Sequence, residues 1–236
     1  MSGQLLYGRN PVHEALRARR RRVRRIWATT GAAKEAWLAD QHVERATGEE
    51  LEARSGTRDH QGVVAEVDPY PYADADALLS ERDPLIVALD EVTDPQNLGA
   101  IARTAEAAGA TGIVIPERRS AEVTPAVAKA SAGAVEHLRI AQVRNLADFL
   151  KDAKDRGCWV YGAAAGARSR YDQPDYRGGV VLVLGAEGKG LRPRVAGMCD
   201  DLISLPLRGR IESLNVSATA AVVLYEMLQQ RVDAST

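Results

Sequence analysis

From residue 85 onward, short apolar segments of strand length alternate with longer segments of helical character. This alternation constrains the fold more than any other feature of the sequence. Continuous apolar strands separated by helices are typical of a parallel sheet that is covered on both faces. The sequence predicts strands at residues 85–89, 111–115, 135–141, 159–163, 180–184 and 202–205, and helices at residues 97–108, 125–132, 146–156, 191–198 and 215–230.

The first 70 residues predict a smaller α/β unit. We expect helices at residues 12–19, 32–46 and 49–54, and strands at residues 23–29 and 62–67. Residues 68–77 are rich in Pro, Asp and Ala, which is typical of a boundary between domains. The chain is therefore expected to hold a first domain at residues 1–70, a linker at residues 71–82 and a second domain at residues 83–236.

The charge is nearly balanced, with 31 Lys+Arg against 32 Asp+Glu, which gives no support to a nucleic-acid partner when taken over the whole chain. The arginines are not evenly spread, however. Seven of them fall within residues 17–25, and residues 1–60 are locally positive. Such a run is either a patch that contacts RNA phosphates or a solvated turn. The candidate RNA contacts are Arg9, Arg19, Arg20, Arg21, Arg22 and Arg24.

The two cysteines, Cys158 and Cys199, lack the spacing of metal ligands, so we expect free thiols and no structural metal. The longest apolar run, residues 180–184, is far shorter than the ~20 residues that a membrane span needs. The N-terminus lacks the apolar core of a signal peptide. We therefore expect a cytoplasmic protein with no membrane partner.

Three motifs lie at junctions between an expected strand and the helix after it. The first contains Asn97, Gly99 and Arg103, with Asn97 at the expected N-cap of its helix. The second contains Gly185, Glu187 and Gly190, and the third is SLNVSA at residues 213–218, with Ser213 as the expected N-cap of the last helix. Ligands of open α/β sheets bind at such junctions, at the carboxyl ends of the strands.

The second motif differs from the known glycine-rich nucleotide loops. It matches neither the Walker A pattern nor GxGxxG. Its carboxylate, Glu187, would repel a phosphate near a helix start. Taken alone, the motif indicates either a tight strand-to-helix turn or a site for a cationic or zwitterionic ligand.

In this order and spacing, the three motifs resemble those of the SpoU branch of the SPOUT RNA methyltransferases. The segments GRNPVHEAL at residues 8–16 and HQGVVA at residues 60–65 are similar to the substrate-binding domain of the same branch. The nearest resemblance is to the subfamily that methylates the 2′-oxygen of a guanosine in 23S rRNA. The resemblance implies a C-terminal α/β-knot, which is a deep trefoil knot in a parallel sheet with helices on both faces. It also implies a small N-terminal α/β domain that resembles ribosomal protein L30e.

The resemblance further implies S-adenosylmethionine as methyl donor, no metal, a 23S rRNA substrate, and a homodimer with the active site at its interface. The implied catalytic residues are Arg103, Asn97, Glu187, Ser213 and Asn215. The implied donor-binding residues are Gly185, Ala186, Glu187, Gly190, Leu205, Leu207, Ser213, Leu214 and Asn215. Asn97 and Arg103 are expected to face the donor site across the dimer interface.

Several alternatives stay open at this stage. The target can be a tRNA, or the chain can be an antibiotic-resistance enzyme that methylates rRNA. From a different class of function, it can be an RNA-binding ribosome-assembly factor whose second domain does not catalyse. A dehydrogenase is suggested only by the glycine loop, and the missing GxGxxG pattern counts against it.

Overall fold

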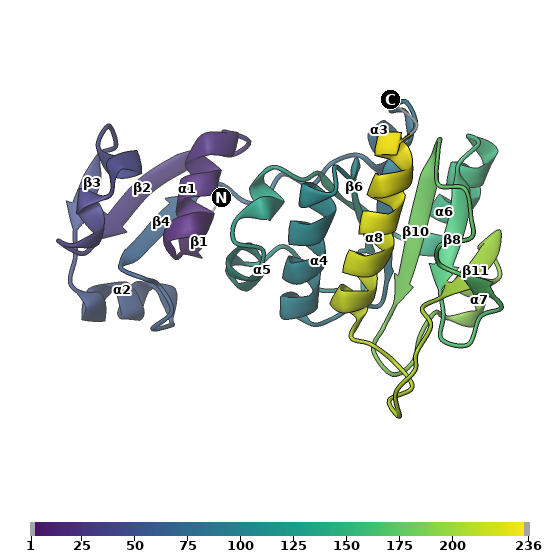
Figure 1. Ribbon diagram of the computed structural model, residues 1–236. Helices are drawn as coiled ribbons and strands as arrows, with labels where there is room; N and C mark the ends of the chain where they lie inside the picture. Colours follow the sequence, from purple (N-terminus) through teal and green to yellow (C-terminus); the bar gives the residue numbers. More distant parts are fainter. Residues whose placement is uncertain (1–2, 234–236) are drawn as a thin grey trace. The chain divides into compact units, whose positions relative to one another are not determined.

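Residues 3–233 are described in the computed structural model, and they divide between two units that are not contiguous in sequence (Figure 1). The first unit contains residues 3–71 together with Val123–His137. The second contains Tyr72–Glu122 together with residues 138–233. The sequence placed everything after residue 83 in one domain, whereas the structure groups Val123–His137 with the first unit.

The second unit is built on a seven-stranded sheet in the order β7-β6-β5-β10-β8-β11-β9. All of its strand pairings are parallel, as the alternating pattern predicts. Leucine, valine and isoleucine dominate the central strands β5 and β10, which are buried over their whole length. The strands are β5 (Leu85–Asp90), β6 (Gly112–Pro116), β7 (Ile140–Val143), β8 (Trp159–Ala163), β9 (Ser169–Arg170), β10 (Val180–Gly185) and β11 (Asp201–Ser204).

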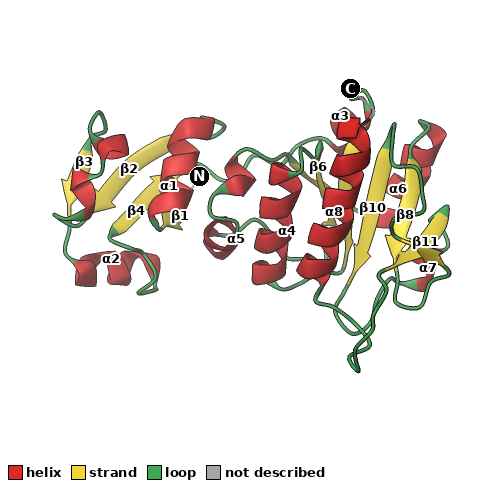
Figure 2. Ribbon diagram, viewed as in Figure 1, coloured by secondary structure: helices red, strands yellow, loops and turns green. Residues whose placement is uncertain are grey.

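Helices cover both faces of this sheet. On one face, α4 (Pro95–Ala107) and α8 (Val216–Asp233) pack side by side (Figures 1 and 2). On the other face, α6 (Leu146–Asp155) buries Phe149 and Leu150 against sheet residues such as Val181. The shorter helices α3 (Ala75–Leu79) and α7 (Pro193–Ala196) contribute Leu78, Leu79 and Val195 to the same apolar cluster.

The first unit contains a four-stranded sheet in the order β1-β4-β2-β3. The β1–β4 and β2–β4 pairings are antiparallel, and β2–β3 is parallel. Its elements are β1 (Gln4–Tyr7), α1 (Arg9–Ala18), β2 (Val23–Ala28), β3 (Val43–Arg45), α2 (Gly48–Ser55) and β4 (Val63–Val67), joined later in the chain by α5 (Pro125–Ala130). Both α1 and α5 pack near β1 in this unit.

Four local expectations are wrong. The helix expected at residues 32–46 is replaced by two 3-10 turns, Ala32–Lys34 and Ala36–Leu38, and by β3, because Val43–Arg45 pairs with β2. The strand expected at residues 135–141 begins only at β7. The helix expected at residues 191–198 is limited to α7. The expected linker at residues 71–82 contains α3, capped by Asp74.

The two expected helix caps are also corrected. The N-cap of α4 is Asp94, whose side chain accepts from the backbone N–H of Gln96, so Asn97 is the third residue of the helix. At the start of α8, the side chain of Asn215 accepts from the backbone N–H of Ser217 at 2.8 Å, which is the role expected of Ser213. Both shifts leave Asn97 and Asn215 with side-chain groups directed at other residues.

Within residues 3–233, no helix is long and apolar enough to cross a membrane. Both cysteines carry free thiols. Among the same residues, no three His, Cys, Asp or Glu side chains gather in a way that could hold a metal ion.

Candidate active site

The candidate site lies where β5 and β10 end side by side in the second unit. In the parallel register, Leu184 pairs with Leu89 and Gly185 with Asp90, so the segments after both strands emerge at the same edge of the sheet. The segment after β5 leads through Asp94 into α4, and the segment after β10 is the glycine-rich loop at residues 186–190. This edge is where open parallel sheets bind ligands.

One polar side chain from each of the three motifs meets the others at this edge. The Nδ2 of Asn97 donates to Oε1 of Glu187 at 3.1 Å. The Nδ2 of Asn215 donates to the Oδ1 of Asn97 at 3.0 Å and also to the same Glu187 oxygen. Asn97 is buried, while Glu187 and Asn215 stand at the surface. The two amides therefore hold one carboxylate in a fixed orientation with its outer side accessible.

A cavity of about 850 Å³ lies on one side of this cluster. Its lining combines backbone of the glycine loop with apolar side chains, including Tyr171, Ile203 and Val223. Its volume is within the range of small-molecule and cofactor sites. All nine residues expected to hold S-adenosylmethionine line it: Gly185, Ala186, Glu187, Gly190, Leu205, Leu207, Ser213, Leu214 and Asn215.

Gly185 shows why the loop needs a glycine at the end of β10. A Cβ at this position would lie 2.3 Å from the carbonyl carbon and oxygen of Gly190 and 2.5 Å from the nitrogen of Leu191. The loop folds back so closely that the backbone N–H of Gly190 donates to the carbonyl of Ala186 at 2.9 Å. Backbone groups, rather than side chains, consequently form this wall of the cavity.

A buried carboxylate anchors the far end of the same loop. Asp90, at the end of β5, is fully buried and accepts from the backbone N–H of Arg192 at 2.8 Å and from its Nε at 2.7 Å. The hydrogen bond from the guanidinium to Asp90 raises the pKa of Arg192. The side chain of Arg192 is 42% exposed, so the pair fastens the loop to the sheet while its outer half remains in water.

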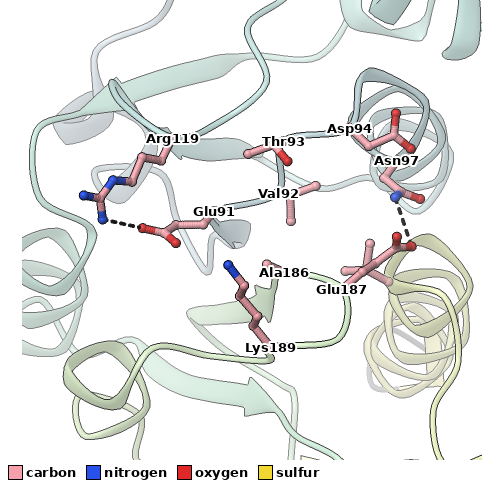
Figure 3. Close-up of a pocket in the computed structure, with 10 residues that line it drawn as sticks. Glu91, Val92, Thr93, Asp94, Asn97, Arg119, Ala186, Glu187 and Lys189 are labelled. Carbon is pink, nitrogen blue, oxygen red and sulfur yellow. Dashed lines mark hydrogen bonds and ion pairs between the residues drawn. The ribbon is translucent and has the colours of Figure 1, made fainter.

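A second, smaller cavity of about 280 Å³ adjoins the cluster (Figure 3). It shares Ala186, Glu187, Lys189 and Val216 with the larger cavity and adds Asn97. Its remaining lining comes from the segments that follow β5 and β6 and is rich in charge: Glu91, Val92, Thr93, Asp94 and Arg119. Within the cluster, Glu187 lines both cavities, whereas Asn97 lines only the smaller one and Asn215 only the larger one.

Arg103 is the one expected catalytic residue that the structure does not bring to this site. It is exposed on α4 and lines neither of the two cavities. Gln96 and Ala107 are exposed on the same helix at helical spacing, so Arg103 belongs to its outward stripe. Ser213 lines the larger cavity but lies outside the hydrogen-bonded cluster described above.

The six candidate RNA-binding arginines of the first unit differ in their surroundings. Arg19 and Arg22 are exposed. Arg9 pairs with Glu35 at 2.8 Å and Arg24 with Asp68 at 2.6 Å, and both are at least partly exposed. Arg20 bonds to the carbonyl of Pro71 at 3.4 Å.

Arg21 departs from the expected role. Its side chain is only 1% exposed, and its guanidinium donates to both carboxylate oxygens of Glu136, to Oε1 of Gln4 at 2.6 Å and to the carbonyl of Asp68. The donors that a phosphate would need are therefore already used inside the first unit, and Arg21 is corrected from an RNA contact to a structural residue.

Sequence reasoning missed four charged residues at the site: Asp90, Glu91, Arg119 and Arg192. Asp90 could have been found, because it is the one polar residue of the otherwise apolar strand β5 and stands at its carboxyl end. Arg192 follows the glycine loop directly, which is a weaker signal. Glu91 and Arg119 belong to no motif, and only the adjacency of β5 and β6 in the sheet brings them to one cavity.

Comparison with known proteins identifies relatives of both parts of the chain. The SpoU rRNA Methylase family matches residues 84–225, and the RNA 2′-O ribose methyltransferase substrate binding family matches residues 5–73. The 23S rRNA (guanosine-2′-O-)-methyltransferase RlmB of Pseudomonas putida is 40% identical over 238 residues, which cover 96% of each chain. An uncharacterized tRNA/rRNA methyltransferase of Mycobacterium avium is 39% identical over 97% of this chain and 78% of its own length.

Among solved structures, the SpoU methyltransferase AviRb from Streptomyces viridochromogenes in complex with AdoMet has a TM-score of 0.82 and 25% identity. The match covers 97% of this chain and 90% of that one. Both family matches lie in the order that the motifs predicted, and together they span most of the sequence. The chain belongs to the SpoU rRNA methylase family.

Proposed function

We propose that this protein transfers a methyl group from S-adenosylmethionine to the ribose 2′-hydroxyl of a guanosine in 23S rRNA. Membership of the family makes the chain an RNA methyltransferase. The guanosine and the 23S rRNA come from the printed name of the RlmB relatives at about 40% identity. The observation that carries the proposal is the convergence of Asn97, Glu187 and Asn215, one from each motif, beside a cavity of cofactor size.

The residues around the larger cavity fit S-adenosylmethionine. The glycine loop offers backbone groups at close range, the apolar side chains suit an adenine ring, and the nearby carboxylate of Glu187 suits a cationic ligand. When bound, S-adenosylmethionine supplies a methyl group on a positively charged sulfur, which the ribose oxygen takes as the carbon–sulfur bond breaks. The chain itself must orient the hydroxyl and lower the energy of its developing negative charge.

Glu187 is placed to orient that hydroxyl. The two amides of Asn97 and Asn215 fix one of its oxygens, which leaves the carboxylate able to accept a hydrogen bond from the ribose at the cluster's open side. A hydroxyl held in this way can lose its proton to the carboxylate or to water as the new bond forms. Positioning of this kind supplies a large part of the rate in reactions between two bound groups.

The positive charge for the developing alkoxide comes, we propose, from Arg103 of a second copy of the chain. Arginine stays protonated and can stabilise an oxyanion or hold a neighbouring phosphate. In one protomer Arg103 lies on the outward stripe of α4, away from both cavities. On α8, which packs beside α4, Val222 and Tyr225 are also exposed, at 41% and 52%. This outward face of α4 and α8 is the proposed dimer interface.

The first unit supplies, in the same proposal, contacts to the rRNA backbone. Exposed arginines such as Arg19 and Arg22 carry charge without a sequence preference, which suits phosphate contact. The trefoil knot implied by the family stays a prediction. Likewise, the roles proposed for Asn97, Glu187 and Asn215 rest on their placement around the two cavities.

The decisive experiment uses tritium-labelled S-adenosylmethionine with unmodified 23S rRNA and unmodified tRNA, followed by mapping of the labelled nucleotide. We expect label on the ribose of one guanosine of 23S rRNA. Labelled tRNA with unlabelled rRNA would contradict the target. No label on either RNA, with S-adenosylmethionine still bound in calorimetry, would instead favour an assembly factor that does not catalyse.

The shared site has its own test. Arg103→Ala is expected to bind S-adenosylmethionine normally and to lose methyl transfer, while Gly185→Trp is expected to lose binding. Co-expression of the two variants should restore about a quarter of wild-type activity, because half of randomly assorted dimers then contain one complete site. Full activity of Arg103→Ala alone, or no recovery in the mixture, would contradict a role for Arg103 across the interface.

A further inference from the structure

The smaller cavity has features that the methyl donor does not explain. Its volume of about 280 Å³ is below the usual range for drug-sized ligands and suits a single nucleobase. It opens beside Asn97 and Glu187, where the ribose must be held if the proposed function is correct. The base attached to that ribose therefore needs a place close to this cavity.

Two residues of the cavity wall adopt a backbone conformation that side chains disfavour. Glu91 has φ 59° and Arg119 has φ 58°, so both are in the left-handed region although neither is glycine. Glu91 follows β5 and Arg119 lies in the segment after β6, the neighbouring strand. Such conformations persist where the surroundings hold them, and they cluster at functional sites.

These two side chains are paired with each other at one wall of the cavity. The Nη1 of Arg119 donates to Oε1 of Glu91 at 3.4 Å. Figure 3 marks this contact with a dashed line. The Arg119 side chain is 78% exposed and that of Glu91 is 21% exposed. A pair this open to water contributes little to stability, so a ligand that offers better partners to both groups can separate them.

Guanine offers such partners on its two edges. Its O6 and N7 accept a pair of hydrogen bonds from an arginine, while its N1–H and N2–H₂ can donate a pair to a carboxylate. Adenine presents an amine in place of O6, and the pyrimidines have no N7. We propose that the smaller cavity reads the target base, with Arg119 bound to O6 and N7 and Glu91 bound to N1–H and N2–H₂. This inference rests on the proposed function, because it concerns the base of the nucleotide that is methylated.

A phosphate is the competing occupant, since Arg119 and Lys189 both carry positive charge. The carboxylates of Glu91, Asp94 and Glu187 line the same small space and would repel it. Arg119 is moreover already paired with Glu91, so an anion bound to Arg119 would lie beside that carboxylate. A neutral base with both donors and acceptors fits this mixture of charges better.

The test changes the target base of the RNA and the residues of the protein independently. Methyl transfer is measured on a synthetic RNA that spans the mapped target, with guanosine or inosine at that position; inosine lacks only the N2 amine. Wild type should lose about 10- to 100-fold in kcat/KM on inosine. Glu91→Gln should lose a similar factor on guanosine but little on inosine, because its amide faces the N2 amine donor to donor. The ratio between the two substrates then falls toward one.

Arg119→Ala is tested in the same way against 7-deazaguanosine, which lacks the N7 acceptor. Wild type should prefer guanosine, whereas the variant should treat the two alike. The matched controls are Glu117→Gln and Arg118→Ala, which alter exposed neighbours that line neither cavity and should leave both ratios unchanged. Affinity for S-adenosylmethionine, measured by calorimetry, should be unaffected in all four variants.

The outcomes separate the two proposals. A wild-type protein that methylates guanosine and inosine equally well overturns the base-reading cavity and leaves the proposed function intact. This comparison uses only the wild-type protein, so it does not depend on whether a variant folds. If Glu91→Gln lowers kcat/KM by the same factor on the guanosine and inosine substrates, the role of Glu91 in reading the base is overturned. A wild-type protein that methylates no RNA ribose overturns the proposed function and, with it, this inference.

Discussion

Each unit of the protein contains an arginine bound to a buried carboxylate, and the two pairs differ in how much water reaches them. In the first unit, the side chains of Arg21 and Glu136 are each 1% exposed. In the second, Asp90 is fully buried, but its partner Arg192 is 42% exposed. Arg21 and Glu136 are 115 residues apart in the chain, and Asp90 and Arg192 are 102 apart.

The difference teaches what each pair does. In the Arg21–Glu136 pair both side chains are buried, so the pair joins two parts of a core and leaves no group for a ligand. In the Asp90–Arg192 pair only the carboxylate is fully buried, so the pair can hold a loop at a binding site while the arginine still contacts water. The two pairs should also respond differently to mutation, because a buried charge that loses its partner is much more destabilising than a half-exposed one.

The largest effect is expected from Arg21→Met, which leaves Glu136 buried without its cation. We expect the free energy of unfolding to fall by about 3–5 kcal/mol, measured by urea denaturation. The control is Arg22→Met at the exposed neighbouring position, where a change within about 0.5 kcal/mol is expected. Adding Glu136→Leu to Arg21→Met should recover part of the loss. A loss below about 1 kcal/mol for Arg21→Met would break the comparison.

Gly185→Ala tests the loop that the open pair fastens. The new Cβ would lie 2.3 Å from backbone atoms of Gly190, so the loop must move outward. We expect a loss of about 1–3 kcal/mol in stability together with a large loss of affinity for S-adenosylmethionine in calorimetry. Gly209→Ala is the matched control, since a Cβ there meets only one atom, at 4.0 Å. Unchanged affinity in Gly185→Ala would contradict the placement of the donor against this loop.

Asp90→Asn sharpens the comparison directly. The amide keeps an oxygen for the backbone N–H of Arg192, and the exposed guanidinium can turn to water or to Glu91, whose Oε1 lies 3.3 Å from its Nη1. We expect a loss of about 1–2 kcal/mol, smaller than that of Arg21→Met. The measurement is again urea denaturation of both variants under one condition. If Asp90→Asn proves the more damaging change, exposure does not govern the strength of the two pairs.

The smallest effect is expected at Glu14 in the first unit, whose partners are His137 and Arg17. Its side chain is 19% exposed, which lies between the exposures of Arg21 and Arg192. Here we expect stability to depend on pH. Burial alone would raise the pKa of Glu14, but hydrogen bonds from His137 and Arg17 outweigh it and lower the pKa below 4.5. A lowered pKa means that this stabilisation is present above about pH 4.5 and is lost as pH falls through the folded-state value. We expect Glu14→Gln to remove less than about 1 kcal/mol at neutral pH, and progressively less as the pH falls through the folded-state pKa of Glu14. A loss that does not change with pH would assign the effect to packing.

Much of the fold could be predicted because the pattern is local. The segments that form β5, β8 and β10 are short, continuous and mainly apolar. Such runs are typical of buried strands in a parallel sheet. The failures are cases where a distant partner decides the conformation. Residues 43–45 form a strand because β2 lies beside them. Residues 134–136 form a 3-10 turn that carries Glu136 to Arg21, a contact that no local pattern reveals.

The candidate site divides in the same way. The motifs that contain Asn97, Glu187 and Asn215 could be found because each has a recognisable spacing at a strand-to-helix junction. The charged wall formed by Glu91 and Arg119 could not be found, because it depends on which strands become neighbours in the sheet. The role of Arg21 was misjudged because a run of arginines looks uniform in sequence, whereas the side chains of such a run differ widely in burial.

The discontinuous first unit has a consequence for how the protein is made. A ribosome completes residues 3–71 first, but α5 and Glu136 belong to the same unit and are not yet synthesised. At about 5–20 residues per second, residues 72–137 follow over about 3–13 s. During that interval Arg21 lacks its carboxylate and β1 lacks α5. The nascent N-terminal segment therefore cannot complete its fold during this interval. Truncation after residue 71 should yield a fragment that does not fold into an independent RNA-binding module.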